Sequence, residues 1–402
     1  HASAAAIYEG GFIVTEETTV FDENGVWQPL GEPLGYMELH NRAMEMFDEF
    51  IAIAEANPEL VFERPWIASE AMTLEDMIPV AHSFKARYMS QVARTPAERD
   101  ALDWGAIIEE AEAGLFTPGE AWEQDVSYIR TNWSSYPGGY YMGINFSAWQ
   151  QVPYFYIGMA DPDGGDYLDW LELPVFQRNA RIDMDDDGAV EPVTIVTPDL
   201  RFPQGETLAE QQDDWRTRGA GGPQVFSATQ TQAHVNPARG TWRWSYYSAE
   251  LPYEQWISIT APVYHVNARE TRLIAAEGYL RQGDAGAAAD IIDETRVAVA
   301  GLDPSGDGND MCVPRLPNGE CGDLFEMLKW EKRMEVWGQG TLNSTWFFDS
   351  RGWGDLYHNT FLHLPVPAAE AQLLGLDDPY HTHGGGEGAS AGVSTYQFPH
   401  EG

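Results

Sequence analysis

Positive charge is scarce in this chain of 402 residues. Lysine is nearly absent, and lysine and arginine together number 23 against 63 aspartate and glutamate residues, so the formal net charge is −40. A negative field of this size repels nucleic-acid phosphates and anionic lipid headgroups. We therefore expect no nucleic-acid partner, and we interpret most of the carboxylates as a solvated, salt-tolerant surface.

Membrane-spanning runs and an initiating methionine are also absent. No apolar run approaches the roughly 18 residues that cross a bilayer. The chain opens with HASAAAIYEGG, which reads like the end of a helix that enters a loop. We therefore predict a processed or truncated N-terminus, with any leader peptide or lipid-anchor cysteine upstream of His1.

Cysteine is rare, and its two copies stand close together in the segment CVPRLPNGEC. The Pro-Asn-Gly triplet between Cys312 and Cys321 is a turn signal, and a turn would bring the two sulfurs within bridging reach. The sequence therefore favours a disulfide and an oxidising compartment over two free thiols. A metal site is not expected at this place, because two cysteines without neighbouring histidines supply too few ligands.

The motifs of common hydrolases are missing. The sequence has no G-x-S-x-G elbow and no H-E-x-x-H pattern, and pairs of carboxylates arise by chance among so many acidic residues. The two histidines of HTHGGG, residues 381–386, fall in a glycine-rich tail that we expect to be mobile. We predict a protein without enzymatic activity. The alternative is a secreted glycoside hydrolase, whose two carboxyl groups would stand about 5–10 Å apart.

Helical periodicity is present in both the first and the last part of the chain. Apolar spacing predicts helices over 35–56, 73–94, 95–115 and 323–339, and a helix hairpin over 267–302. Thr73 is a candidate N-cap with Asp76 at the capping-box distance, although Pro79 favours a later start. The hairpin resembles one tetratricopeptide pair, with small residues at 287–289 where its helices approach. A single pair cannot bury its own face, so the earlier helices are its expected partners.

The middle of the chain, residues 116–261, has a different composition. Helical periodicity fades, and glycine, proline, tryptophan and tyrosine dominate. The segment is too long for a linker and too aromatic for disorder, so we predict an irregular insertion that carries the function. The predicted fold is a mostly α, tetratricopeptide-like scaffold with a long irregular aromatic-rich insertion, in a single domain over 1–402. The scaffold comprises 1–115 and 262–380, and the flexible tail is 384–402.

The insertion supplies the groups that bind sugars and peptides. A sugar ring has one apolar face, which tryptophan or tyrosine covers, and a rim of hydroxyl groups, which polar side chains bond. The ligand-binding candidates are Trp133, Tyr136, Tyr140, Tyr141, Asn145, Trp170, Trp244 and Tyr247. In TWRWSYY, strand alternation would place Trp244 and Tyr246 on one face and Tyr247 on the other, with one face in the core. The alternative is that many of these aromatics are core residues, and we expect fewer than half to contact ligand.

Acidic residues at alternate positions in DMDDDG, residues 183–188, match the start of an EF-type calcium loop with glycine in the sixth place. The bidentate glutamate of position twelve is missing, and a nearby glutamate is the expected substitute. The candidate metal ligands are Asp183, Asp185, Asp187 and Glu191. No cofactor is required, and a structural calcium ion is the one that the sequence allows. The alternative is an acidic turn without an ion.

Several blocks together resemble the SusD/RagB family, the surface nutrient-binding lipoproteins of Gram-negative bacteria. The helix hairpin is followed by Glu331-Lys332-Arg333 in a predicted helix, then by WFFDSRGWGDL, and then by a P-x-P segment at 365–367. The blocks cover essentially the whole chain in the family's order. One departure is that the N-terminal portion of the family is missing before His1.

The resemblance implies a non-enzymatic binding component of an outer-membrane uptake system, located on the cell surface. It would capture an oligosaccharide or a peptide and deliver it to a SusC-type TonB-dependent transporter, held at the outer membrane by a lipid anchor upstream of this chain. The resemblance also gives Asp349, Arg351 and Trp353 a structural role. We expect the Arg351 guanidinium to fork onto a carboxylate, Asp349 or Glu331, and to stack on a tryptophan. A surface or filament-forming structural protein on the same fold is a further alternative.

Overall fold

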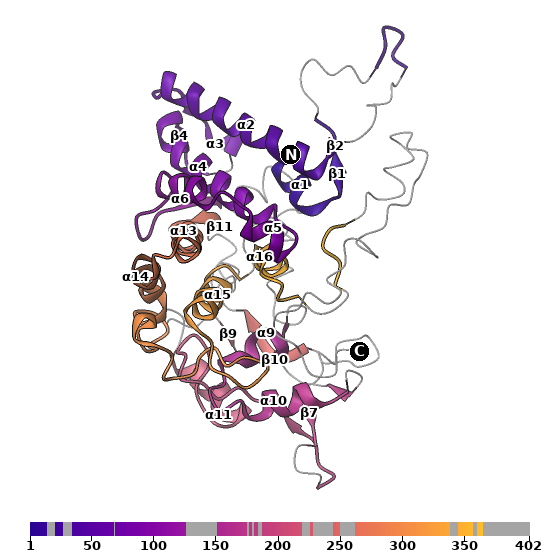
Figure 1. The fold of residues 1–402 in the computed structure, drawn as a ribbon, viewed down its shortest axis with the longest axis vertical. Helices are drawn as coiled ribbons and strands as arrows, with labels where there is room; N and C mark the ends of the chain where they lie inside the picture. The colour runs from indigo at the N-terminus through magenta and orange to yellow at the C-terminus, as the bar shows by residue number, and fades with distance from the viewer. Residues whose placement is uncertain are drawn as a thin grey trace. The chain divides into compact units, whose positions relative to one another are not determined.

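The computed structural model describes residues 1–13, 21–26, 34–67, 69–125, 151–174, 177–178, 181–183, 187–218, 226–227, 244–249, 262–337, 345–356 and 360–364. The chain forms two compact units. Figure 1 labels the helices and strands along the chain. The first unit comprises His1–Val61, Thr73–Leu115 and Ser344–Thr395. The second unit comprises Phe62–Met72, Phe116–Asn343 and Tyr396–Gly402.

The first unit is built from helices. They are α1 (Ala2–Ile7), α2 (Tyr36–Ala56), α4 (Leu74–Gln91), α5 (Pro96–Asp100), α6 (Trp104–Glu112) and α16 (Thr345–Trp353). Helix α2 packs on α1 and α4, α4 packs on α6, and α16 packs on α4 and α5. The short strands β1 (Gly10–Gly11) and β2 (Leu34–Gly35) pair antiparallel beside them. Tyr88 packs with Ala2 and Ala43 in one buried cluster, and Phe348 packs with Ala6 and Ile7 in another.

Local capping determines where the helices of the first unit begin. The Thr73 hydroxyl accepts from the Asp76 amide at 3.1 Å, and the Asp76 carboxylate accepts from the Thr73 amide at 3.0 Å, which is the predicted capping box. The predicted later start at Pro79 is wrong, because this reciprocal cap fixes the first turn and the proline lies inside α4. The segment 95–115 forms two helices, because Asp103 caps a second start by accepting from the Ala106 amide at 3.1 Å.

The second unit combines helices with short strands. Its main helices are α10 (Gly165–Glu172), α11 (Leu208–Arg218), α13 (Ala268–Gln282), α14 (Ala285–Arg296) and α15 (Leu324–Glu335). Shorter turns are α3 (Arg64–Ile67), α9 (Tyr154–Ile157), η1 (Gly158–Ala160) and η6 (Ser305–Asp307). The strands are β5 (Ala121–Asp125), β6 (Gln151–Pro153), β7 (Arg181–Ile182), β8 (Glu191–Pro192), β9 (Phe226–Ser227), β10 (Trp244–Ala249) and β11 (Pro262–Asn267). Strand β10 lies between β6 and β9 in a three-stranded sheet, while β11 pairs with β5 and β7 with β8. Two further strands, β3 (Val61–Phe62) and β4 (Met72–Thr73), pair with each other.

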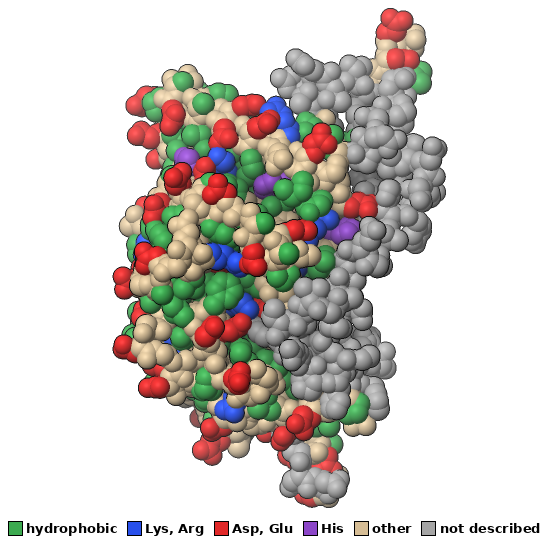
Figure 2. All heavy atoms as spheres, viewed as in Figure 1, with side chains coloured by type: hydrophobic (Ala, Val, Ile, Leu, Met, Phe, Trp, Pro, Cys, Tyr) green, Lys and Arg blue, Asp and Glu red, His purple; other side chains and the backbone are tan. Residues whose placement is uncertain are grey.

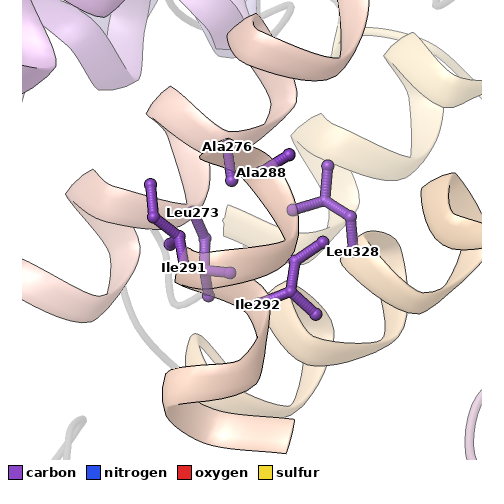
Figure 3. Packing of buried hydrophobic residues seen from close by; sticks show 6 residues of the cluster. All are labelled: Leu273, Ala276, Ala288, Ile291, Ile292 and Leu328. Carbon is purple, nitrogen blue, oxygen red and sulfur yellow. The ribbon is translucent and has the colours of Figure 1, made fainter. Parts of the chain in front are cut away.

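The helix hairpin of the second unit forms as the sequence predicts. Asn267 caps α13 by accepting from the Glu270 amide at 3.0 Å. Gly283 ends that helix with φ of 86°, a left-handed conformation that glycine adopts without strain. Figure 3 shows the buried cluster in which α13, α14 and α15 meet, formed by Leu273, Ala276, Ala288, Ile291, Ile292 and Leu328. The alanines at the contact allow the helices to approach closely.

The described part of the chain is mostly helical, and helix pairs stack in each unit, which confirms the predicted mostly α, tetratricopeptide-like class. The predicted scaffold and insertion do not coincide with the two units, because α13, α14 and α15 belong to the same unit as 116–261. The single-domain organisation therefore stays a prediction. The predicted tail, 384–402, lies outside the described residues.

The surface is strongly acidic. Figure 2 shows acidic side chains spread over the visible face of the described residues, with far fewer lysine and arginine side chains among them. Among the described helices, none has both the length and the apolar character needed to cross a membrane.

Candidate functional site

The predicted ligand-binding residues fall into three groups in the structure. Trp133, Tyr136, Tyr140, Tyr141 and Asn145 lie outside the described residues, so their role stays a prediction. Trp244 begins β10, and its side chain is likewise not described.

Trp170 and Tyr247 are core residues, which corrects their assignment as ligand contacts. Their side chains are 1% and 0% exposed. Tyr154 lies between them, with ring centroids 5.5 Å from Trp170 and 6.4 Å from Tyr247. Rings enclosed in this way present no face to a ligand, and they fix α9, α10 and β10 against one another.

Hydrogen bonds complete this aromatic core. The Tyr247 hydroxyl donates to Oε1 of Gln211 at 2.6 Å and accepts from the Ile195 amide at 2.9 Å. The Tyr154 hydroxyl donates to the Val193 carbonyl at 2.5 Å. Burial raises the pKa of Tyr247, so the phenol stays neutral and able to donate. Since both hydroxyl groups are satisfied inside the unit, we assign this cluster a structural role.

Strand β10 shows why alternation alone misassigned its residues. Tyr246 and Tyr247 follow one another in β10, whose pairing with β6 shifts register between Trp244 and Ser248, and they are 3% and 0% exposed. The strand is therefore enclosed at that point. The sequence pattern predicts which residues share a face, whereas the packing of other segments on each face decides which of them meet solvent.

Three of the four candidate calcium ligands lie among the described residues. Asp183 accepts from the amides of Asp187 at 3.1 Å and Gly188 at 2.9 Å, and Asp187 accepts from the Ala189 amide at 2.7 Å. The carboxylates of Asp183 and Asp187 thus accept hydrogen bonds from backbone amides, which is compatible with either of the two predictions made for this segment. Asp185 lies outside the described residues, and Glu191 lies in β8. Among the described side chains, no group of three histidine, cysteine or acidic residues is placed to hold a metal ion. Calcium binding stays a prediction.

Cys312 and Cys321 are joined in the structure, with Cα atoms 4.8 Å apart. The loop that they close contacts the segment after α9 through Arg315. Its amide donates to the Met159 carbonyl at 2.8 Å, and its Nη1 donates to the Pro162 carbonyl at 2.5 Å. The loop is thus anchored by hydrogen bonds in addition to the disulfide.

Helix α16 contains the motif residues Asp349, Arg351 and Trp353, all of them buried. The prediction that Arg351 binds a carboxylate is wrong. Its Nη1 donates to the Leu362 carbonyl at 2.5 Å, and its Nη2 donates to the Gln91 carbonyl at 2.8 Å. Its Cζ lies 4.9 Å from the ring of Phe348 instead of a tryptophan. Burial, with a smaller effect of the nearby Arg94, lowers the pKa of Arg351 to about 9, so it remains charged at neutral pH.

The Asp349 carboxylate pairs with an arginine that the sequence did not single out. Arg99 Nη2 donates to Oδ1 at 3.0 Å, and both side chains are fully buried. Arg99 also lies against the Trp353 ring, with Cζ 5.2 Å from the centroid. The three motif residues therefore hold α16 onto α4 and α5, which is the structural role that the resemblance implies.

Glu331, the other predicted partner of Arg351, belongs to a buried network around Arg201. The Arg201 guanidinium donates to Asp199 at 2.8 Å, to Glu331 at 2.7 Å and to Glu335 at 3.3 Å. The Thr295 hydroxyl donates to the same Glu331 at 2.9 Å. Desolvation raises the pKa of Glu331, and the adjacent guanidinium opposes that rise. In the sequence, Arg201 lies between Leu200 and Phe202, and no local pattern identified it as the centre of this network.

One exposed aromatic residue was also missed. Trp66, in α3, is 77% exposed, more than any other large hydrophobic side chain among the described residues. It lies outside the aromatic-rich segment on which the sequence prediction concentrated. An unusually exposed indole in a short ordered helix was not recognisable from composition.

No family model matches the sequence, and no curated protein matches it. Among solved structures, the chain is similar to a SusD-like protein from Bacteroides fragilis NCTC 9343, with 14% sequence identity and a TM-score of 0.40. The alignment covers 87% of this chain and 65% of that chain. This chain therefore spans slightly less than two thirds of the length of that structure.

Proposed function

We propose that this chain is a non-enzymatic surface binding protein of the SusD/RagB type. It captures a glycan or an oligopeptide on the extracellular face of the outer membrane and delivers it to a SusC-type TonB-dependent transporter. A lipid anchor upstream of the chain would hold it there. The observation that carries the proposal is the ordered series of sequence blocks: Glu331-Lys332-Arg333, Asp349-x-Arg351-x-Trp353, and the P-x-P segment at 365–367.

The burial of the motif residues supports a scaffold role for these blocks. Glu331 and Asp349 are fully buried, and Arg351 is 1% exposed. A catalytic or ligand-binding loop would present such groups to substrate, whereas these side chains hold helices together. Ligand capture would therefore fall to other parts of the chain, and the aromatic residues between 126 and 150 are the predicted contacts.

The pairing of buried carboxylates with an arginine supports binding without catalysis. Asp199, Glu331 and Glu335 are buried carboxylates, and all three contact Arg201. A glycosidase needs one carboxyl that donates a proton to the leaving group and another that reaches the sugar. Carboxylates that are sealed from solvent and paired with a guanidinium are unable to reach a substrate.

The proposal is tested by applying the purified chain to arrays of oligosaccharides and oligopeptides. We expect saturable binding to members of one of these classes. A labelled oligosaccharide incubated with the protein should be recovered at its original length. Binding to neither class would contradict the proposal, shortened oligosaccharide would indicate a hydrolase, and ordered filaments in electron micrographs would indicate the structural alternative.

Matched variants separate the ligand contacts from the scaffold. Trp133→Ala and Tyr141→Ala should weaken binding with little change in melting temperature. Arg351→Met should lower the melting temperature, because it strands the carbonyl groups of Leu362 and Gln91. The folded fraction of that variant should still bind. Loss of binding in Arg351→Met at an unchanged melting temperature would place α16 in the ligand site.

The transporter is tested separately. The anchored full-length protein, isolated from its own outer membranes in mild detergent, should copurify with a TonB-dependent transporter. Recovery of the protein without any transporter would contradict this part of the proposal while leaving ligand binding intact.

A further inference from the structure

Two arginine side chains of the first unit are buried without an ion-pairing carboxylate. Arg94, which follows α4, is 7% exposed, and Arg351 in α16 is 1% exposed. Among the described residues, both guanidinium groups donate only to backbone carbonyls. Arg94 donates to Ala5 at 3.2 Å and to Tyr8 at 2.5 Å, and Arg351 donates to the two carbonyls given above. A buried charge is costly unless a group of opposite charge compensates it.

The two guanidinium groups belong to the same neighbourhood. Arg94 bonds α1 and the residue after it, and the last residue of α1, Ile7, accepts from the Leu364 amide at 2.7 Å. Arg351 bonds the Leu362 carbonyl, two positions earlier in that segment. Burial lowers the pKa of Arg351, and the charge of Arg94 lowers it further. Two positive charges that repel each other are therefore held at one end of the first unit.

The carboxylates nearby do not neutralise this pair by direct contact. Asp349 is bound by an arginine of its own. Glu98 accepts from the backbone amide of Arg94 at 2.6 Å, and neither Glu98 nor Glu9 forms an ion pair with either guanidinium among the described residues. Burial lowers the pKa of Arg94, and the nearby acidic groups offset only part of that fall. The buried positive charge is thus incompletely compensated.

Unpaired hydrogen-bond donors accompany this charge. In the part of the chain that the structure describes, the Nε atoms of Arg94 and Arg351 and both polar atoms of the Gln91 amide are buried without a hydrogen-bond partner. Gln91 ends α4, is 0% exposed, and supplies the carbonyl that Arg351 binds at 2.8 Å. Buried donors are nearly always paired in native proteins. Two guanidinium N–H groups and an amide NH₂ group together suit an acceptor that carries negative charge.

The burial of these donors selects the kind of anion. Each of the three side chains is more than nine-tenths buried, so the ligand must be small. It must also give up its water, and a monovalent ion is less costly to dehydrate than a divalent one. Chloride meets both conditions, and it is abundant in the saline surroundings that the acidic surface suits.

We propose that Arg94, Arg351 and Gln91 bind a chloride ion, which accepts from the two Nε–H groups and the side-chain amide and compensates the guanidinium charges. The bound ion joins the end of α4 to α16 and stabilises the first unit. The proposal does not rest on the transport function, because a protein with another role on this fold would be stabilised in the same way.

The test separates chloride binding from general screening. Urea unfolding of the full chain is followed by circular dichroism in mixtures of sodium chloride and sodium methanesulfonate, a larger anion, at constant ionic strength. The screening of the surface carboxylates is then the same in every mixture. For one site, the folding equilibrium constant should rise about tenfold for each tenfold rise in chloride above its dissociation constant. Bromide should act in the same way.

Gln91→Leu removes one donor and keeps a similar side-chain volume. In methanesulfonate alone this variant should be at least as stable as the wild type, because an apolar group replaces an unpaired buried amide. Its affinity for chloride should be about tenfold lower or less than that, the loss expected for a hydrogen bond to a charged group. Arg42→Gln is the matched control, because Arg42 pairs with Glu45 and Glu49 at the surface, and it should keep the full chloride dependence.

Crystals of the wild-type chain grown in sodium bromide locate the ion directly. We expect an anomalous bromide peak at hydrogen-bonding distance from the Nε atoms of Arg94 and Arg351 and from the Gln91 amide. The absence of a peak at this place would overturn the proposal. So would a stability that depends on ionic strength but not on the anion, or a chloride dependence that Gln91→Leu leaves unchanged. Each of these results would leave the proposed function standing.

Discussion

The buried ion pair between Arg99 and Asp349 permits a quantitative test of how α16 is held. Asp349→Ala would leave the Arg99 guanidinium inside the first unit without its carboxylate, although the Ser90 carbonyl still accepts from Nη1 at 3.0 Å. Both partners of the pair are fully buried, and their charged atoms are 3.0 Å apart. Removing one partner of a buried pair costs about 3–5 kcal/mol, because the remaining charge is uncompensated.

This loss should be visible by two methods. For a cooperative unit of this size, 3–5 kcal/mol corresponds to a fall in melting temperature of roughly 6–20 °C. Scanning calorimetry measures that fall, and urea unfolding followed by far-ultraviolet circular dichroism measures the free energy. Glu45→Gln is the matched control: its carboxylate pairs with Arg42 at the surface, 2.9 Å away, so less than about 1 kcal/mol should be lost.

A double-mutant cycle isolates the pair itself. If the two side chains are coupled, Asp349→Ala combined with Arg99→Met should cost less than the sum of the two single changes, because no stranded charge remains. The reasoning is refuted if Asp349→Ala lies within about 1 kcal/mol of the wild type, or if the two substitutions add.

The remaining predictions concern titration, the disulfide and the second buried network. Burial lowers the pKa of His40 from 6.5 to about 4, so it contributes stability above pH 6.5 that is lost as pH falls towards 4, at most about 3 kcal/mol. Urea unfolding of His40→Gln between pH 4 and 7 should lack that loss, and an unchanged slope would contradict it. Burial raises the pKa of Asp161 from 3.8 to about 6, so its contribution is present below pH 3.8 and is lost as pH rises through 6. Asp161→Asn should therefore lack that loss, so its free energy of unfolding should fall less than that of the wild type as pH rises from 4 to 7. Mass spectrometry of native protein should find Cys312 and Cys321 oxidised, and Cys321→Ser should cost at most about 2–3 kcal/mol, because the closed loop is short; two free thiols would disprove the bridge. Arg201→Met should lower stability by about 3–5 kcal/mol at neutral pH, since it strands several carboxylates, and a destabilisation that does not diminish on acidification would contradict this explanation.

Sequence reasoning predicted several helix ends from short-range signals, and it missed the cap at Asp103 that divides 95–115 into α5 and α6. Thr73 and Asp76 stand three residues apart, and their reciprocal bonds fix the start of α4. Asn267 and Gly283 bound α13 in the same way. Such features depend on neighbours within one helical turn, so they are readable without knowledge of the fold.

The sequence of the middle segment predicted an irregular, aromatic-rich region but not which aromatics are core. Trp170 and Tyr247 have the same side chains that a sugar platform uses, and they are buried where they pack against Tyr154, with Phe202 also against Tyr247. Trp66 shows the opposite case, since a single tryptophan outside that region is exposed. Exposure depends on which distant segment covers a side chain, and residue type does not encode that.

The sequence by itself determined the acidic surface, the mostly helical class and the hairpin over 267–302. Only the tertiary structure decided the partners of the charged residues. Asp349 binds Arg99, which lies 250 positions earlier in the chain, and Arg201 binds Glu331, which lies 130 positions later. A short motif specifies that an arginine and a carboxylate are present. Which of the chain's many acids each arginine meets depends on helix packing, because the bond needs both atoms within about 3 Å and both side chains withdrawn from water.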